Sequence, residues 1–301
     1  MRFNRLDLNL LVALDALLAE KKTTAAAQRL SVSQSAVSGM LARLRVYFED
    51  ELLVQVGRQM ELTPLGRDLA EPVRKLLLQV QATISIRPTF SFATERRHFR
   101  ITVSDYTVPV LMAPLIRRLQ QIAPLITLEL LPQIEHVGQS LMRGETDFLI
   151  VPDEYIDPAF PHAVLFEDSF SCVVWDGNEE VGETLDRDTF MRCGHVASRL
   201  GRPSAPTMVE RHFESSNIVR HIAVTTHDFA GMAPIVLGTN LIATMQTRLA
   251  RECAARLPLR VLALPVALPV LRLHMQWHDY QTSDPAHRWL REQIGAVAAN
   301  G

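Results

Sequence analysis

The chain carries the stretch TTAAAQRLSVSQSAVSGMLARLR at residues 23–45, and this stretch predicts two helices joined by a tight turn. In the first helix Ala26 and Ala27 share one face, where their small side chains would let a second helix approach closely. Thr23 or Thr24 is placed as the N-cap of that helix. The spacing therefore favours a compact helix pair, of which the second helix is the more informative.

The second helix has two distinct faces. Its apolar side chains recur at three- and four-residue spacing and form a core stripe of Val37, Leu41, Leu44 and Phe48. The opposite face carries Gln34, Ser35, Ser38 and Arg45, and Ser33 is placed as the N-cap. A rigid helix with short polar side chains on its outer face can enter the major groove of DNA. The pattern predicts a helix-turn-helix with double-stranded DNA as its partner, against the alternative of an ordinary amphipathic helix pair.

Residues 51–63 follow the helix pair with a pattern typical of a short β-hairpin. Apolar residues stand on both sides of the turn dipeptide Gly57-Arg58. A hairpin in this place would form a wing beside the helix-turn-helix. Arg58 at its tip would then lie beside the DNA backbone or in a narrow minor groove, where a guanidinium group is attracted most strongly to the negative charge of the DNA.

Several separated motifs are shared with a known family. In the N-terminal part they are FNRLDLNLLVALDA at residues 3–16, AAQRL at 26–30, SQSAVS at 33–38, LARLRVYF at 41–48 and LTPLG at 62–66. Further along they are GETDFLIVP at 144–152, GHVA at 194–197 and GTNLIAT at 238–244. Together these motifs resemble the LysR-type transcriptional regulators along the whole chain. Within that family the chain most resembles the nodulation-gene activators and the regulators of aromatic-compound degradation.

The chain also departs from this family at positions that bear on DNA binding. Many members carry proline at position 35 and arginine at position 39, where this chain has Ser35 and Gly39. Many also carry a basic residue in place of Gln55. We therefore expect an operator that differs in detail, and binding that depends more on the arginines. The residues predicted to contact DNA are Thr23, Ser33, Gln34, Ser35, Ser38, Arg43, Arg45 and Arg58.

Composition agrees with such a protein. The chain has 301 residues, which is long enough for two or three packed units. Its hydrophobic content of 48% argues against a disordered protein. No apolar run approaches the roughly twenty residues that span a membrane, and residues 1–16 lack the pattern of a signal peptide, so we expect a cytoplasmic protein. Residues 1–90 hold 12 Lys and Arg against 9 Asp and Glu, whereas the remainder holds 19 against 24. The modest basic excess coincides with the predicted DNA-binding part.

Residues 64–87 predict one long helix after the DNA-binding domain of residues 1–63. Its apolar stripe is longer than a small winged domain can cover, and Pro72 within it suggests a kink or a local break. The stripe favours self-association through paired linker helices over packing against the chain's own second domain, and the family resemblance implies the same. We expect a homodimer or a homotetramer, with a hinge at residues 88–95.

From residue 96 to residue 301, predicted strands alternate with predicted helices, which implies parallel β-α-β units in an α/β effector-binding domain. Lobe one is predicted at about 96–163 and 270–301, and lobe two at about 164–269. A single strand is expected over residues 165–175, and alternation over residues 271–278 predicts a half-buried strand. The family resemblance implies a two-lobed fold like that of the periplasmic binding proteins, with a ligand cleft between the lobes.

Ligands of open parallel sheets bind beyond the carboxyl ends of the strands. Ser104, Asp105 and Tyr106 follow the first predicted strand and enter a helix whose free N–H groups favour an anionic group. His195 and His227 are carried over from the aromatic-responsive relatives, in which matching histidines line the effector cavity. These five residues are the predicted contacts of a small aromatic effector, anionic or phenolic. The alternatives are a helix cap for Asp105 and ordinary structural roles for both histidines.

No catalytic motif supports an enzyme. The chain lacks the GxSxG, P-loop, HExxH and CxxC patterns, and its histidines lack metal-ligand spacing, so no catalytic residue, cofactor or metal is predicted. The separated Cys172, Cys193 and Cys253 are expected to be reduced thiols. The sequence thus predicts a ligand-responsive, DNA-binding transcriptional regulator that acts with RNA polymerase. The alternative is a two-lobed α/β enzyme or small-molecule binding protein with an incidental helix-turn-helix-like segment.

Overall fold

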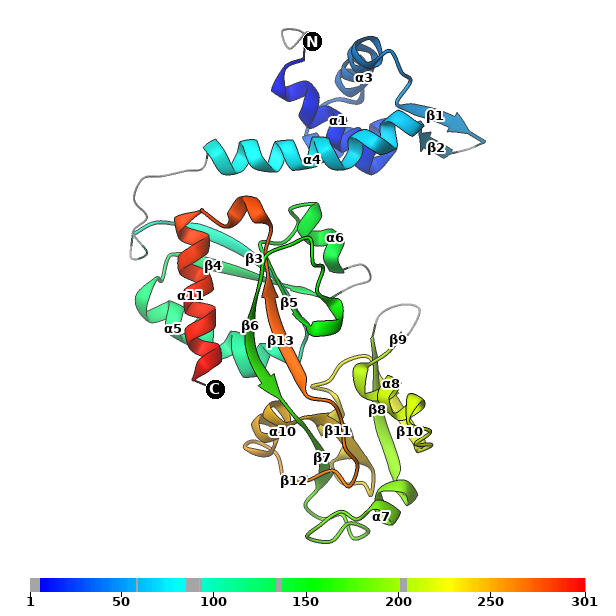
Figure 1. The fold of residues 1–301 in the computed structure, drawn as a ribbon, viewed down its shortest axis with the longest axis vertical. Coiled ribbons are helices and arrows are strands. Elements are labelled where there is room, and N and C mark those ends of the chain that lie inside the picture. Colours follow the sequence, from blue (N-terminus) through cyan, green and yellow to red (C-terminus); the bar gives the residue numbers. More distant parts are fainter. Residues whose placement is uncertain are drawn as a thin grey trace. The chain divides into compact units, whose positions relative to one another are not determined.

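Figure 1 shows the computed structural model of the chain, which describes residues 6–57, 59–84, 92, 94–133, 137–200 and 205–300. The chain divides into two compact units, residues 1–87 and residues 88–301. Each unit has a hydrophobic core of its own, because the clusters of buried apolar side chains do not mix residues of the two.

The first unit is a winged helix-turn-helix followed by a long helix. Its elements are α1 (Leu8–Glu20), α2 (Thr23–Leu30), α3 (Gln34–Phe48), β1 (Leu53–Val56), β2 (Gln59–Leu62) and α4 (Pro64–Ile84). Helix α1 packs against α2, α3 and α4. Ala26 and Val37 are fully buried in their common core, so the small alanine does permit the close helix contact. The predicted helix-turn-helix and hairpin are confirmed.

The helix starts follow the expected capping chemistry at α3 but not at α2. Ser33 caps α3 by accepting a hydrogen bond from the N–H of Ala36 at 3.2 Å, as predicted. Neither Thr23 nor Thr24 caps α2, because this helix already begins at Thr23 and its N-cap is Lys22, which makes no capping bond. The predicted cap of α2 is therefore wrong by one or two residues.

Helix α4 is continuous from Pro64 to Ile84, so Pro72 does not end it. Pro72 is exposed, and its missing N–H costs the helix one internal hydrogen bond. Arg74 of α4 forms an ion pair with the buried Asp15 of α1 at 2.8 Å. Further along, Leu76 is 45% exposed and Ile84 is 77% exposed. Helix α4 thus leaves apolar side chains uncovered within this chain.

The second unit contains two sheets, each the centre of one lobe (Figure 1). The strands of lobe one lie in the order β4-β3-β5-β13-β6. They are β3 (Arg97–Val103), β4 (Ile126–Pro132), β5 (Phe148–Pro152), β6 (His162–Asp168) and β13 (Leu271–Gln276). The helical segments are η2 (Val108–Met112), α5 (Ala113–Ile122), α6 (Val137–Met142), η3 (Asp153–Tyr155), η4 (Asp279–Gln281) and α11 (Pro285–Ala299). Strands β4 and β5 pair with β3 in parallel, as the predicted β-α-β units require.

The strands of lobe two lie in the order β10-β8-β11-β7-β12, and β9 pairs with β8. They are β7 (Phe170–Trp175), β8 (Gly194–Leu200), β9 (Ala205–Pro206), β10 (His221–Thr226), β11 (Ile242–Gln246) and β12 (Leu259–Leu262). The helices are α7 (Arg187–Arg192), α8 (Met208–Ser215), α9 (Met232–Val236) and α10 (Thr247–Ala254). The chain crosses between the lobes twice, from β6 to β7 and from β12 back to β13.

Two sequence expectations about strands differ from the structure. The single strand expected over residues 165–175 is two strands, β6 and β7, which lie in different sheets and meet at Ser169. The strand expected to be half-buried, β13, is buried on both faces except at Arg272, since His274 is 6% and Gln276 is 0% exposed. Strand β13 lies between β5 and β6 inside the sheet, where both faces are covered.

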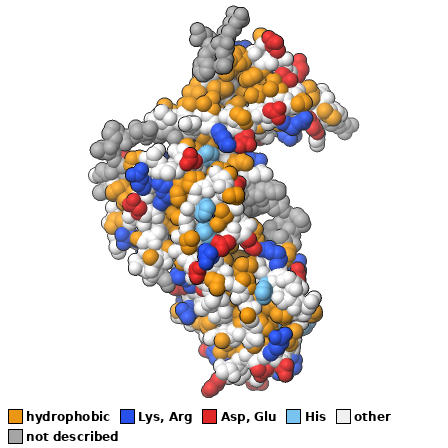
Figure 2. All heavy atoms as spheres, viewed as in Figure 1, with side chains coloured by type: hydrophobic (Ala, Val, Ile, Leu, Met, Phe, Trp, Pro, Cys, Tyr) orange, Lys and Arg blue, Asp and Glu red, His pale blue; other side chains and the backbone are white. Residues whose placement is uncertain are grey.

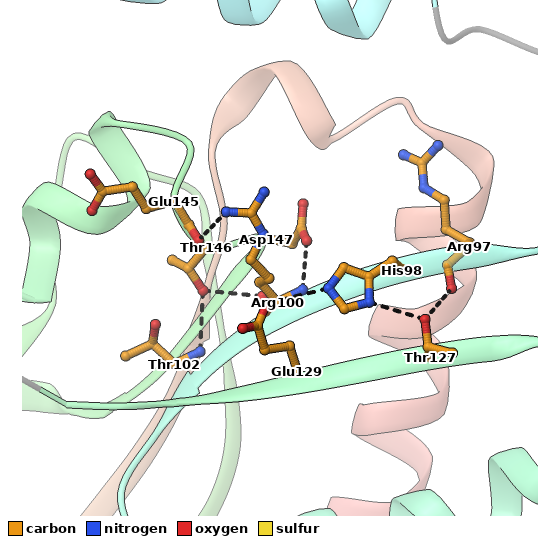
Figure 3. A network of polar contacts seen from close by, with 9 residues as sticks. All are labelled: Arg97, His98, Arg100, Thr102, Thr127, Glu129, Glu145, Thr146 and Asp147. Carbon is orange, nitrogen blue, oxygen red and sulfur yellow. Dashed lines mark hydrogen bonds and ion pairs between the residues drawn. The ribbon is translucent and has the colours of Figure 1, made fainter. Parts of the chain in front are cut away.

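The loop before β5 is fixed to β3 by the polar network in Figure 3. The backbone N–H of Arg100 donates to Asp147 Oδ2 at 2.8 Å, and the N–H of Thr102 donates to Thr146 Oγ1 at 3.2 Å. The carbonyl oxygen of Asp147 accepts from His287 Nε2 of α11 at 3.2 Å. Residues 144–152 therefore do more than form a strand, because the side chains of Thr146 and Asp147 hold the loop before β5 against β3.

Among the residues that the structure describes, no helix is both long enough and apolar enough to cross a membrane. Within the same ranges, no group of three or more His, Cys, Asp or Glu side chains is placed to hold a metal ion.

Candidate functional site

The outer face of α3 is open to solvent and carries small polar side chains. Gln34, Ser35 and Ser38 are exposed and follow the N-cap Ser33. Gln34 Nε2 donates to Thr23 Oγ1 at 3.4 Å, and the hydroxyl groups of Ser33 and Ser35 lie 3.0 Å apart. These contacts are long or between exposed groups, so the same donors and acceptors can form hydrogen bonds with base edges instead. The structure thus brings together five of the residues predicted to contact DNA.

The arginines predicted to contact DNA differ in how firmly they are held. Arg43 forms an ion pair with Asp7 at 3.3 Å, and both side chains are largely exposed. Arg45 donates to the carbonyl oxygens of Glu51 and Leu53 at 3.0 Å each, and its Nε lies 3.0 Å from Glu51 Oε2. Arg45 therefore fixes the loop between α3 and β1, a structural role that the sequence prediction did not include.

The wing is a tight hairpin. Strands β1 and β2 pair antiparallel from Leu53 opposite Leu62 to Val56 opposite Gln59. Gly57 at the turn has φ +62°, a left-handed conformation that glycine adopts without strain. Arg58, predicted to touch the DNA backbone, lies outside the described residues.

A small cavity of about 50 Å³ lies between the two lobes of the second unit. It is lined by Ser104, Tyr106, Gln133, Pro152, Glu154, Tyr155, Phe170, Thr207, Met208, Val209, Phe229, Gln246, Leu271 and Leu273. Two of the five predicted effector contacts, Ser104 and Tyr106, are among them. The lining is mainly apolar and aromatic and, among the residues that the structure describes, includes no Lys or Arg. Such a surface suits a flat apolar molecule with few polar groups.

Gln246 is the polar lining residue with an unused hydrogen-bonding atom. It ends β11, its side chain is 5% exposed, and its Oε1 has no hydrogen-bond partner among the described residues. By contrast, Gln133 Nε2 donates to the carbonyl oxygen of Ile150 at 2.7 Å. An unpaired buried acceptor is costly, so a donor that enters the cavity would gain from reaching Gln246.

Tyr106 presents its ring to the cavity and uses its hydroxyl elsewhere. The hydroxyl donates to Asp168 Oδ2 at 2.7 Å, at the end of β6. Burial raises the pKa of Tyr106 far above its usual value, and the neighbouring Asp168 charge adds to this. Tyr106 therefore stays a neutral donor and contributes an apolar surface to the cavity.

Asp105 connects the lobes. Its Oδ2 accepts hydrogen bonds from the backbone N–H groups of Phe229 (2.7 Å) and Ala230 (2.6 Å), which belong to lobe two. Burial raises the pKa of Asp105, although these two hydrogen bonds act in the opposite direction. Asp105 does not line the cavity. Its side chain caps a turn of the other lobe, which differs from the predicted effector contact and from the alternative of a cap on its own helix.

The two predicted effector histidines do not line the cavity. His195 is fully buried in β8, donates from Nε2 to the carbonyl oxygen of Phe190 at 2.7 Å, and packs edge-on against the Phe190 ring. Burial lowers the pKa of His195 to about 4. His227 is exposed, and its Nδ1 lies 3.3 Å from the carbonyl oxygen of Arg199. The placement of His195 corresponds to the alternative of a structural histidine, although its buried Nδ1 has no hydrogen-bond partner among the described residues.

Twelve of the fourteen residues that line the cavity were missed by the sequence prediction, Glu154 and Gln246 among them. Glu154, from η3 after β5, lines the cavity and forms an ion pair with Arg211 of α8. Gln246 lines it from β11. These residues come from separate elements of both lobes and share no motif, so only the tertiary fold brings them together.

The comparisons with known proteins agree with this architecture. The family model described as "Bacterial regulatory helix-turn-helix protein, lysR family" matches residues 8–67, and that described as "LysR substrate binding domain" matches residues 93–299. "Nodulation protein D 1" of Rhizobium tropici is 42% identical over 292 residues, which cover 97% of this chain and 94% of that protein.

Two solved structures extend the comparison. One is a probable transcriptional regulator from Pseudomonas aeruginosa, 26% identical with a TM-score of 0.63 over 98% of this chain and 99% of that one. The other is full-length CbnR complexed with its target DNA, 16% identical with a TM-score of 0.53 over 97% of this chain and 100% of that one, a likeness of fold alone. The matched families are regulators and not enzymes. The chain therefore belongs to the LysR family of helix-turn-helix transcriptional regulators.

Proposed function

We propose that this ligand-responsive regulator reads its operator with α3 and responds to a neutral, planar, hydroxyl-bearing aromatic molecule in the inter-lobe cavity. The DNA part of the proposal is supported by the exposed Gln34, Ser35 and Ser38 on a helix held rigid by its buried stripe. Arg43 and Arg58 are proposed to contact the backbone. The two recognition helices of a dimer would enter successive major grooves of an operator with two half-sites.

The chemistry of the effector is inferred from one atom above all, the unpaired Oε1 of Gln246. This acceptor calls for a donor such as a phenolic hydroxyl group. A carboxylate is disfavoured because Glu154 lines the cavity and, among the described residues, no lining Lys or Arg would neutralise a second negative charge. Of the two effector classes that the sequence left open, the lining therefore favours the phenolic one.

The size of the cavity bears on how such a molecule would act. An engineered apolar cavity of about 150 Å³ binds benzene, whereas the present volume is about 50 Å³. An aromatic effector therefore has to move the lobes apart or displace lining side chains. Binding coupled to such a movement gives the differential affinity for two arrangements that any ligand-driven switch requires.

The effector proposal is tested with 1-naphthol, 1-naphthoate and the variant Gln246→Leu. Wild type is expected to bind 1-naphthol on the order of tenfold more tightly than 1-naphthoate, and Gln246→Leu to lose about tenfold for 1-naphthol, the effect of about one hydrogen bond. Thr244→Val is the matched control, because Thr244 also has a buried unpaired oxygen but does not line the cavity. Tighter binding of the naphthoate, or unchanged binding by Gln246→Leu, would contradict the proposal.

We also propose self-association through α4, as a homodimer or homotetramer. Apolar side chains gather on the first unit in Figure 2, and Leu8 and Val12 of α1 and Leu76 of α4 are among its exposed apolar residues. Pairing these helices with those of a second copy would cover this surface. Sedimentation of the full chain should give the mass of two or four chains, and the mass of one would exclude this assembly.

Regulation of transcription implies RNA polymerase as the further partner and the cytoplasm as the place of action. Transcription in vitro from the promoter beside the chain's own gene, with and without 1-naphthol, tests this part. Transcript levels that never depend on the protein would contradict it.

A further inference from the structure

The ion pair between Glu154 and Arg211 joins the lobes beside the cavity. Glu154 belongs to η3 in lobe one, and Arg211 belongs to α8 in lobe two. Arg211 Nη1 also donates to the hydroxyl of Tyr155 at 3.4 Å and to the carbonyl oxygen of Pro206 at 2.8 Å. Glu154 and Tyr155 both line the cavity. The side chains of Arg211 and Glu154 are 39% and 32% exposed, so the pair lies where the cavity approaches solvent.

Another polar connection between the lobes is of a different kind. Asp105 accepts two backbone hydrogen bonds, from Phe229 and Ala230, and is more deeply buried than the ion pair. Hydrogen bonds from N–H groups to a carboxylate are strong. An exposed ion pair, in contrast, contributes little because water screens it and ordering the two side chains costs entropy. Of the two connections, the Glu154–Arg211 pair is therefore the easier to break.

We infer that Glu154 and Arg211 form a gate, and that the strength of their ion pair sets the effector concentration at which the regulator responds. This inference rests on the proposed function, because it takes the inter-lobe cavity as the effector site. The cavity is too small for an aromatic ring unless it widens. Widening at the exposed end separates Glu154 from Arg211, while the hydrogen bonds of Asp105 keep the lobes joined.

The consequence is a population effect. An effector that binds only the open arrangement has its apparent affinity reduced by the fraction of molecules that are open. The exposed ion pair at the gate lowers this fraction, but only by a small factor. Its removal should raise the open fraction on the order of two- to fivefold, the range expected for an exposed pair, and lower the half-maximal effector concentration by the same factor.

Opening can be measured without effector or DNA by the rate at which a buried thiol reacts with a thiol reagent. Val209 is 7% exposed and lines the cavity, so Val209→Cys places a reporter there, and Cys253→Ser removes the partly exposed native thiol. In this full-length background, Arg211→Gln and Glu154→Gln should each speed labelling on the order of two- to fivefold. The reversed pair E154R/R211E should restore slow labelling.

Two comparisons make the test decisive. Arg256→Gln is the matched control, since Arg256, in the turn after α10, pairs with Glu252 of α10, both are exposed, and neither bridges the lobes. Glu154→Gln changes lobe one, whereas the reporter at position 209 lies in lobe two. An equal rise in the labelling rate of this variant therefore cannot come from a local disturbance of α8. Labelling rates in both gate variants equal to that of the control overturn the gate. Faster labelling in a protein that binds neither operator nor 1-naphthol overturns the proposed function and leaves the gate standing.

Discussion

Replacing Gln34 and Ser38 together by alanine is expected to abolish sequence-specific operator binding while the N-terminal unit stays folded. Both side chains are exposed on α3, and the core stripe that holds this helix does not include them. Each lost base contact removes about 1–3 kcal/mol of discrimination, so the double variant should lose roughly 30-fold or more in specific affinity. Non-specific binding should persist, because phosphate contacts supply it.

The measurement is a footprint on the promoter beside the chain's own gene, together with thermal unfolding of the purified variant. Gln28→Ala is the matched control: Gln28 is exposed on α2 and not on the reading face of α3. A footprint that survives in the Gln34 and Ser38 variant with undiminished protection would refute α3 as the reader. Loss of the footprint in Gln28→Ala as well would point to a general disturbance of the unit.

Two buried histidines are expected to contribute about 4 kcal/mol of destabilisation to the second unit when the pH falls from 7 to 5. Burial lowers the pKa of His195 to about 4 and that of His287 to about 3, from about 6.5 in the unfolded chain. His287 is 1% exposed and stacks on the ring of Phe148 at a centroid distance of 4.0 Å. Between the folded and unfolded pKa values, the unfolded state binds a proton that the folded state does not.

The sign follows directly from this difference in bound protons. Stability falls as pH drops below about 6.5, by about 1.4 kcal/mol per pH unit for each histidine, and the loss continues to the folded pKa. The raised pKa values of the buried Asp105, Asp147 and Asp168 act in the opposite direction, because the folded state binds their protons more tightly. The histidine contribution must therefore be isolated by substitution.

Urea unfolding of wild type, His195→Gln and His287→Gln at pH 7 and pH 5 separates these effects. Each substitution should remove about 2 kcal/mol of the pH dependence, whatever it does to stability at pH 7. His98→Gln, at an exposed histidine, serves as the control for the loss of an imidazole group. Equal pH dependence in all four proteins would show that neither buried histidine titrates as described.

The parts of the fold that depend on local patterns could be predicted from the sequence. The stripe of Val37 and Leu44 on α3 and the cap at Ser33 involve residues three to seven positions apart, so their spacing alone indicates the geometry. The same holds for the hairpin around Gly57 and for the β-α-β units at the start of the second unit. Family resemblance then extended these local patterns to the architecture of the whole chain.

The rest depends on contacts between distant segments. Only Ser169 stands between β6 and β7, and the different strand partners on either side of it separate the two lobes. The carboxylate of Asp105 reaches Phe229, and Glu154 reaches Arg211, across more than fifty residues of chain in each case. His195 was assigned to the cavity by analogy, whereas burial and its bond to Phe190 place it in the core. No periodicity in the sequence carries this information.

The central claim is that this chain binds operator DNA with α3 and with arginine side chains that contact the DNA backbone. Its most direct test is the binding constant of the full chain for its promoter DNA, measured from about 50 to 200 mM salt. We predict that log Kobs falls linearly with log salt, with a slope of about −4 or steeper, because several phosphate contacts release counterions. A slope near zero, or equal affinity for promoter and unrelated DNA at every salt concentration, would contradict the account.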